Sequence, residues 1–152
     1  MKKIILFVAT SLMMAISSYA TVYRVTAYSL ETEGDGSSWQ SPMSLVNALS
    51  VAQADDIIYL KAGTYIIDNA INISKPITLK GGFLGTDDET MAGKPLTIFD
   101  TDRKTTFNSV LSITTTSSGA INKVINIGLK NGYARGLYKK GQADLLVEGC
   151  LI

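Results

Sequence analysis

A short, β-branched run of residues recurs along this chain at a fixed spacing of about twenty residues. Residues 57–61 read IIYLK, residues 77–81 read ITLKG and residues 97–100 read TIFD. A period of this length is typical of solenoids, in which each repeat has an apolar face that only a neighbouring repeat can cover. The repeat therefore predicts stacked coils.

The first twenty residues have the three-part pattern of a secretory signal peptide. Lys2 and Lys3 form a basic start, residues 4–16 are mostly apolar, and the small residues Ser18 and Ala20 precede the expected cleavage site. The apolar stretch is shorter than the ~20 residues that a membrane-spanning helix needs. We therefore expect an exported chain with no transmembrane span after signal removal. It would be secreted, held at the bacterial cell surface or outer membrane, or retained in the periplasm.

Charge and composition argue against several classes of function. Loss of the signal peptide removes two lysines and no acid, so the formal net charge changes from +1 to −1. A near-neutral chain gives no electrostatic basis for binding nucleic acid. The chain has no histidine and a single cysteine, Cys150. It therefore lacks the usual general base near neutral pH and cannot form an intrachain disulfide.

The segment before the repeats predicts a cap. Residues 22–26 alternate like a strand, and residues 31–38 are rich in Gly, Asp and Ser like a loop. Ser41 and Pro42 are typical of the N-cap and first position of a helix, which should end near residues 53–54. A strand and an amphipathic helix would cover the open end of a solenoid. The expected divisions are a signal peptide (1–20), a cap of strand, loop and helix (21–56), and the coils (57–152).

The remaining expected strands are short and are bounded by turn residues. They are expected at residues 56–60, 71–73, 77–80, 96–100, 110–113, 124–129 and 145–147. This pattern favours an all-β, right-handed parallel β-helix, a solenoid of about four to five coils. A β-sandwich is the alternative, although it would show hairpin alternation at a shorter spacing of about 8–12 residues.

The last residues, 145–152, stop inside an apolar strand pattern. An uncovered terminal coil is prone to associate with other chains. Two interpretations follow. The chain is either the N-terminal part of a longer protein, truncated at its C-terminus, or a short complete protein whose uncapped last coil is covered by a partner or by self-association.

Several segments resemble a family of known proteins. They are residues 34–39 (GDGSSW), 56–65 (DIIYLKAGTY) and 77–85 (ITLKGGFLG), with further similarity at 125–134 and 147–150. The chain resembles secreted right-handed parallel β-helix proteins of the pectin-lyase-like superfamily, nearest the bacterial surface proteins related to chlamydial polymorphic outer membrane proteins. The resemblance implies the β-helix fold and a surface location. It implies no single activity, because the superfamily includes lyases, hydrolases, esterases and non-catalytic adhesins.

One loop carries acidic residues at alternate positions. Glu31, Glu33 and Asp35 are followed by a glycine, as in the first half of an EF-hand calcium loop. The twelfth position of such a loop supplies a bidentate acid, but here it is Pro42. We name the three acids as candidate Ca²⁺ ligands and assign no cofactor, because the closing ligand is missing. The alternative is a Gly-rich turn that leads to Trp39.

Asp100 and Asp102 are two residues apart, with Arg103 beside them. On a strand the two acids would share one face. A polysaccharide lyase needs acidic groups, often with Ca²⁺, to neutralise a uronate carboxylate, and a Lys or Arg to remove the adjacent proton. These three residues are therefore the candidate catalytic residues. The alternative is a strand end that runs into a polar turn.

Five aromatic residues are candidates for a surface that stacks on sugar rings, because exposed aromatic rings match the apolar faces of pyranoses. They are Tyr59, Tyr65, Phe83, Tyr133 and Tyr138. Packing in the core or at coil edges is the alternative for each of them. Residues 87–89 are all acidic and predict a solvated loop tip.

These patterns favour a non-catalytic, exported protein that acts as an adhesin, a glycan-binding protein or a structural scaffold. No coherent catalytic constellation spans the predicted coils. The alternative is the N-terminal fragment of a polysaccharide lyase or related carbohydrate-active enzyme whose catalytic coils lie beyond residue 152. The expected partners are cell-surface glycans or polysaccharide.

Overall fold

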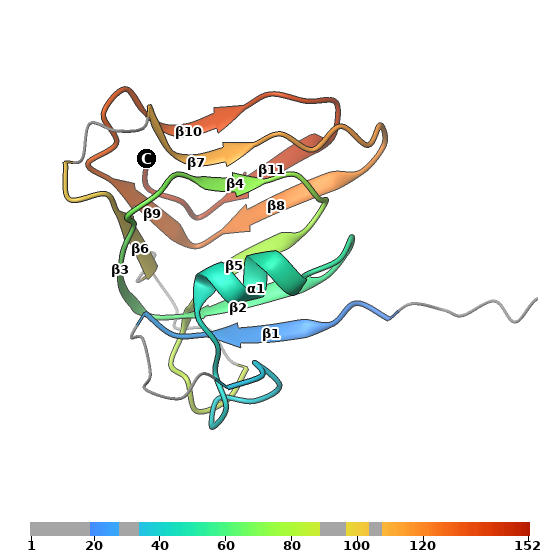
Figure 1. Cartoon of the computed structure of the whole chain (residues 1–152), viewed down its shortest axis with the longest axis vertical. Coiled ribbons are helices and arrows are strands. Elements are labelled where there is room, and N and C mark those ends of the chain that lie inside the picture. The colour runs from blue at the N-terminus through green and yellow to red at the C-terminus, as the bar shows by residue number, and fades with distance from the viewer. Residues whose placement is uncertain (1–18, 28–33, 89–96, 104–107) are drawn as a thin grey trace, which may run out of the picture.

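A computed structural model describes residues 19–27, 34–88, 97–103 and 108–152 (Figure 1). The described chain is mostly β, with one five-stranded sheet and two three-stranded sheets. The five-stranded sheet contains, in order, β1 (Val22–Val25), β2 (Ile57–Lys61), β5 (Thr78–Phe83), β8 (Ile121–Ile125) and β11 (Asp144–Glu148). The second sheet contains β10 (Arg135–Lys139), β7 (Ser109–Ile113) and β4 (Ile71–Ile73). The third contains β3 (Gly63–Ile66), β6 (Thr97–Asp100) and β9 (Ile127–Lys130).

From β2 onward, successive strands enter the three sheets in turn. The strands β2, β3 and β4 lie in different sheets, and so do β5, β6 and β7, and then β8, β9 and β10. Every pairing between described strands is parallel. One hydrophobic core joins all three sheets through fully buried side chains such as Leu79, Phe99 and Leu111. Burial of this continuous core is the main stabilising contribution that the structure shows.

The structure corrects the predicted fold class. It shows three separate sheets of parallel strands and a short helix, and not the all-β, right-handed β-helix of four to five coils that the sequence pattern favoured. The twenty-residue period fails because its third run, β6, lies in a different sheet from β2 and β5. Along the five-stranded sheet Ile58 pairs with Leu79, Leu79 with Val124, and Val124 with Val147, so the spacing between partners is not constant. The β-sandwich alternative is also wrong, because its hairpins require antiparallel pairs.

Most predicted strands are present, but two strands were missed and one was divided. The strand predicted at 124–129 is two strands, because Asn126 adopts a left-handed conformation (φ 55°) that turns the chain from β8 into β9. The strands β3 and β10 were not predicted. Each is only four or five residues long and contains a glycine, a residue depleted in strands, so the local pattern did not single them out.

The predicted cap helix is shorter than expected and starts later. The helix α1 runs over Leu45–Val51, and Ser44 rather than Ser41 is its N-cap, with its side chain accepting from the Asn47 N–H at 3.3 Å. Residues 41–43 are instead held to neighbouring backbone: Gly36 N–H donates to the Ser41 carbonyl, and Met43 N–H donates to the Arg24 carbonyl. Because of these hydrogen bonds, residues 41–43, which were predicted to form the first turn of the helix, lie outside it.

Some predictions concern residues outside the described ranges. The signal-peptide prediction rests mainly on residues 1–18, and two of the candidate Ca²⁺ ligands are Glu31 and Glu33; all of these lie outside the described residues. No helix in the described ranges is both long and apolar enough to cross a membrane. Export therefore stays a prediction.

A bulge in β5 decides which face of the five-stranded sheet carries Phe83. Tyr59 pairs with Lys80, but Lys61 pairs with Phe83, so β5 contains one extra residue between these two pairs. Gly82 takes a positive φ of 88° at the bulge. The side chains of a strand alternate between its faces, so the extra residue places Phe83 on the same face as Tyr59, away from the core.

Candidate functional site

The three candidate catalytic residues lie at a strand end and its turn. Asp100 is the last residue of β6, whereas Asp102 and Arg103 follow it with left-handed φ values of 50° and 57°. The two acids therefore do not share a strand face as predicted. Asp102 and Arg103 are exposed, but Asp100 is only 7 % exposed.

The Asp100 carboxylate holds this corner of the fold together. Its Oδ1 accepts from the Asp102 N–H at 2.8 Å and from Asn131 Nδ2 at 2.7 Å, and its Oδ2 lies 3.2 Å from Lys130 Nζ. Burial by itself would raise the pKa of Asp100, but these hydrogen bonds and the lysine outweigh burial and hold it below its ordinary value. The contacts give Asp100 a structural role, joining the end of β6 to the end of β9.

The candidate Ca²⁺ loop is described only from Gly34 onward. Asp35 is exposed, and its Oδ1 accepts from the Ser37 hydroxyl at 2.6 Å and from the Ser37 N–H at 3.0 Å. These bonds, the hydroxyl bond first, lower the pKa of Asp35. The carboxylate thus forms a local turn. Among the described residues, no three His, Cys, Asp or Glu side chains are grouped closely enough to hold a metal ion.

Three aromatic rings gather on the outer face of the five-stranded sheet. The rings of Tyr59 and Phe83 stack with centroids 4.1 Å apart, and the ring of Trp39 lies 5.7 Å from that of Phe83. Phe83 is fully buried, whereas Trp39 and Tyr59 are half-buried. We call Trp39, Tyr59 and Phe83 the aromatic patch. Phe83, at the centre of the patch, is shielded from solvent, whereas Trp39 and Tyr59 are partly exposed.

Two cations flank the aromatic patch. Arg24, Tyr59 and Lys80 are register partners on β1, β2 and β5, so they form one row across the sheet. Lys80 Nζ lies 5.9 Å from the centroid of the Tyr59 ring and 5.6 Å from that of Phe83. Such distances allow a cation–π attraction. The aromatic patch is therefore flanked by Arg24 on one side and Lys80 on the other.

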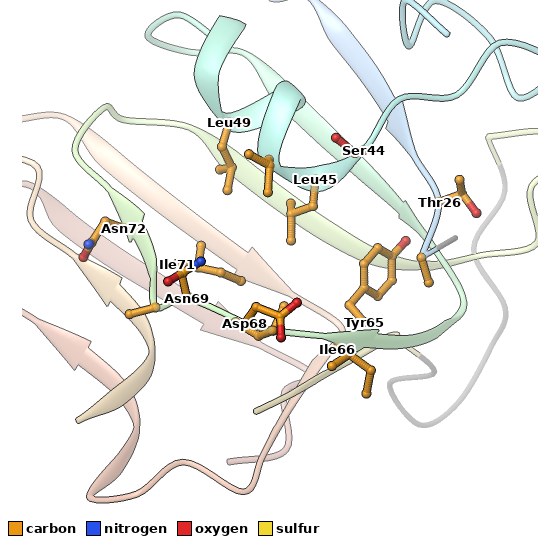
Figure 2. Close-up of a pocket in the computed structure, with 14 residues that line it drawn as sticks. Thr26, Ser44, Leu45, Leu49, Tyr65, Ile66, Asp68, Asn69, Ile71 and Asn72 are labelled. Carbon is orange, nitrogen blue, oxygen red and sulfur yellow. The ribbon is translucent and has the colours of Figure 1, made fainter. Parts of the chain in front are cut away.

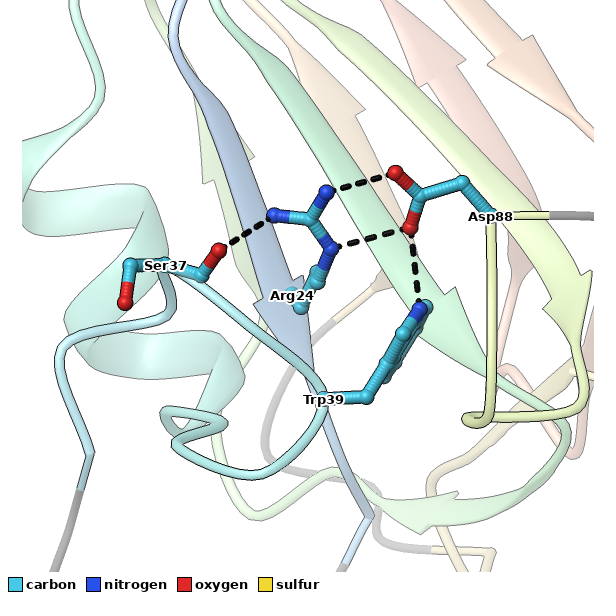
Figure 3. Close-up of polar contacts among 4 residues, drawn as sticks. All are labelled: Arg24, Ser37, Trp39 and Asp88. Carbon is cyan, nitrogen blue, oxygen red and sulfur yellow. Dashed lines mark hydrogen bonds and ion pairs between the residues drawn. The ribbon is translucent and has the colours of Figure 1, made fainter.

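The Arg24 side chain is fixed by three acceptor atoms, two on the Asp88 carboxylate and one on the Ser37 backbone (Figure 3). Its Nε and Nη2 donate to the two carboxylate oxygens of Asp88 at 2.9 and 2.5 Å, and its Nη1 donates to the Ser37 carbonyl at 2.7 Å. Trp39 Nε1 donates to Asp88 Oδ1 at 2.9 Å. The hydrogen bond from Arg24 is the main cause that lowers the pKa of Asp88. Asp88 therefore ties the edge of the aromatic patch to β1.

The predicted five-residue sugar-stacking surface does not form as one surface. Only Tyr59 and Phe83 come together; Tyr65 is 4 % exposed, and its hydroxyl lies within hydrogen-bond distance of the carbonyl oxygens of Val25 and Lys61. Tyr133 is exposed, and Tyr138 packs against Arg135 with the guanidinium carbon 5.0 Å from the ring centroid. These tyrosines belong to the core or to other parts of the surface.

A groove lies between α1 and the segment from β3 to β4 (Figure 2). Its volume is about 490 Å³, which is within the range of ~300–1,000 Å³ that is typical of small-ligand pockets. Leu45 and Leu49 point from α1 toward Tyr65 and Ile71 on the opposite wall. The lining is predominantly apolar, and Asp68 is the one charged residue in it among the described residues.

Sequence reasoning missed the residues that complete the aromatic patch. Arg24 and Trp39 were not singled out as site residues. Asp88 lies in an exposed loop, as predicted, but its ion pair with Arg24 was not predicted. Asp88 is separated from Arg24 by 64 positions and from Trp39 by 49. No local sequence pattern links residues so far apart. Only the two glycines of β5, which indicate a bulge in the strand, could have pointed to this site.

Comparison with known proteins adds no family to this description. No family model, no curated protein and no solved structure matches the chain.

Proposed function

We propose that this chain is an exported, non-catalytic protein that binds carbohydrate through the aromatic patch. The observation that carries the proposal is the position of Trp39, Tyr59 and Phe83 outside the core, on the outer face of the five-stranded sheet. Phe83 is itself fully buried, so the half-buried rings of Trp39 and Tyr59 are the part of the patch that a ligand could contact.

The polar groups around the patch suit a hydroxyl-rich ligand. Arg24 and Asp88 hold each other in a fixed, two-point geometry, and Trp39 is fixed through its indole N–H. Side chains that are already ordered lose little conformational entropy when a ligand binds. Lys80 adds a cation that makes ring contacts and no ion pair with a described residue. A sugar ring stacked on Tyr59 would lie within reach of these donors.

The contacts of the candidate catalytic residues favour a binding role over catalysis. The oxygens of Asp100 are already engaged by Asp102, Asn131 and Lys130. No observation favours the lyase alternative specifically, so we propose binding alone.

The proposal is tested by affinity electrophoresis of the purified chain in gels containing soluble polysaccharides, both neutral and acidic. We expect retardation by at least one of them, and we expect Tyr59→Ala to weaken it by about tenfold or more, which corresponds to the loss of one stacking contact of ~1.4 kcal/mol. Tyr133→Ala is the matched control, because Tyr133 is 65 % exposed and lies outside the patch. Equal retardation of both variants, or no retardation by any polysaccharide, would overturn the proposal.

Export is tested separately by expressing the whole chain in a bacterial host and sequencing the N-terminus of the product outside the cytoplasm. A product that begins at Thr21 supports export. An uncleaved product confined to the cytoplasm contradicts it.

A further inference from the structure

The strand β4 (Ile71–Ile73) forms one edge of its sheet, beside the groove. Among the described residues its one strand neighbour is β7. Ile71 and Asn72 line the groove on one side, and Leu45 and Leu49 line it on the other (Figure 2). The edge of a sheet is therefore next to an apolar hollow.

The backbone of Asn72 faces the free side of β4. The Thr114 N–H donates to the Ile73 carbonyl at 2.7 Å, so the backbone groups of Ile73 point toward β7. In a parallel ladder, the N–H and C=O of a residue point to the same side and alternate residues point to opposite sides. The N–H and C=O of Asn72 therefore point away from β7. An extended polypeptide is the ligand whose own backbone satisfies both groups at once.

We propose that this groove binds an extended, apolar peptide segment of a partner protein, which adds a strand to the free edge of β4. The three residues of β4 span about 10 Å at ~3.3 Å per residue. A strand of that length presents alternate side chains to the groove, between Leu45 and Leu49 on one wall and Tyr65 on the other. This binding site is separate from the aromatic patch, and the proposal stands independently of carbohydrate binding.

The lining also indicates the charge of the peptide. Asp68 is the one charged group among the described residues that line the groove, and it lies on the link between β3 and β4. An acidic residue in the peptide at this position would be repelled, and a basic one attracted. The expected ligand thus alternates apolar and small polar residues and carries a lysine or arginine toward one end.

The experiment is fluorescence polarisation with the purified chain and the fluorescein-labelled peptide KTVTVT. We expect saturable binding. A second peptide carries N-methyl groups on its two central amides. Adjacent amides of a strand point to opposite sides, so one of the two would face β4 and could not donate a hydrogen bond. This peptide should bind at least about tenfold more weakly. Equal affinity for the two peptides, or no binding up to about 1 mM, would overturn the proposal.

Two proline variants locate the site. Asn72→Pro removes the N–H that faces the groove and leaves the β4–β7 bonds in place, because proline is tolerated on an edge strand. It should lower the affinity by about tenfold or more. Lys139→Pro is the matched control on β10, the opposite edge of the same sheet, and should bind the peptide like the unmodified chain. A dimer of the chain that competes with the peptide and is abolished by Asn72→Pro would identify a second copy as the occupant, and the peptide proposal would fail.

Discussion

Arg24 and Asp88 are 64 positions apart in the chain, yet the guanidinium donates to both carboxylate oxygens, at 2.9 and 2.5 Å. The same carboxylate accepts the indole N–H of Trp39 at 2.9 Å. Trp39 is the only tryptophan of the chain. Its fluorescence therefore reports directly on the ion pair that anchors the aromatic patch.

The Arg24–Asp88 pair makes part of the stability depend on pH. The pKa of Asp88 is lowered in the folded state, chiefly by its hydrogen bond from Arg24. The ionised carboxylate therefore stabilises the fold at neutral pH, and this contribution is lost as the pH falls through the lowered pKa. The Asp88 side chain is 43 % exposed, so we expect Asp88→Asn to cost only about 0.5–1 kcal/mol at pH 7.

Urea unfolding, followed by Trp39 fluorescence at several pH values, measures this effect. The difference between the unmodified chain and Asp88→Asn should narrow as the pH falls below about 4. Asp55→Asn is the control, because the exposed Asp55 side chain makes no hydrogen bond or ion pair with another described residue. A difference for Asp88→Asn that is constant with pH would contradict the assignment.

The close approach at Gly81 should make β5 intolerant of a larger residue. A Cβ atom at Gly81 would lie 2.5 Å from the Asn126 carbonyl oxygen and 2.7 Å from the Thr97 Cβ. Gly81→Ala should therefore destabilise the fold by about 1–3 kcal/mol through overpacking. At Gly128 the nearest atom, Ile98 Cγ1, would be 3.5 Å away. Gly128→Ala should change the free energy of unfolding by less than about 0.5 kcal/mol. Thermal unfolding monitored by circular dichroism compares the Gly81→Ala and Gly128→Ala variants.

Tyr65 should behave as a buried polar anchor. Its hydroxyl lies 3.1 Å from the Val25 carbonyl oxygen and 3.0 Å from that of Lys61, and burial raises the pKa of Tyr65 well above its ordinary value. Tyr65→Phe should cost about 1–2 kcal/mol, because a buried hydrogen bond is removed. Tyr133→Phe, at an exposed position, should cost nothing measurable. Alkaline titration followed by absorbance at 295 nm should show one tyrosine that ionises only as the protein unfolds. If this ionisation is missing in Tyr65→Phe, the tyrosine is Tyr65.

Asp100 and Asp102 should differ sharply in their effect on stability. The Asp100 carboxylate has three donors, whereas Asp102 is exposed in the turn. Asp100→Ala should destabilise the fold by about 1–3 kcal/mol, because three donors lose the largely buried acceptor that joins β6 to β9. Asp102→Ala should change stability by less than about 0.5 kcal/mol. Similar losses for the two variants in urea unfolding would show that Asp100 does not hold this corner.

The sequence was informative where a feature depends on neighbouring residues. The strands over Val22–Val25, Ile71–Ile73 and Ser109–Ile113 were predicted to within one or two residues, because alternation and turn residues are local signals. The helix was predicted, but its start was wrong. Its true start depends on backbone hydrogen bonds that join Gly36 to Ser41 and Arg24 to Met43. These bonds hold residues 41–43 outside the helix, and the local sequence around residue 41 does not reveal them.

The sequence by itself thus determined where most strands lie, and that the chain lacks histidine chemistry and an intrachain disulfide. The tertiary structure alone decided which strands pair, that β6 joins β3 and not β5, and that Trp39, Phe83 and Asp88 meet beside Arg24. The physical reason is that short apolar strands have nearly interchangeable local patterns. The partner of each strand is set by long-range burial and by corner conformations such as that of Asn126.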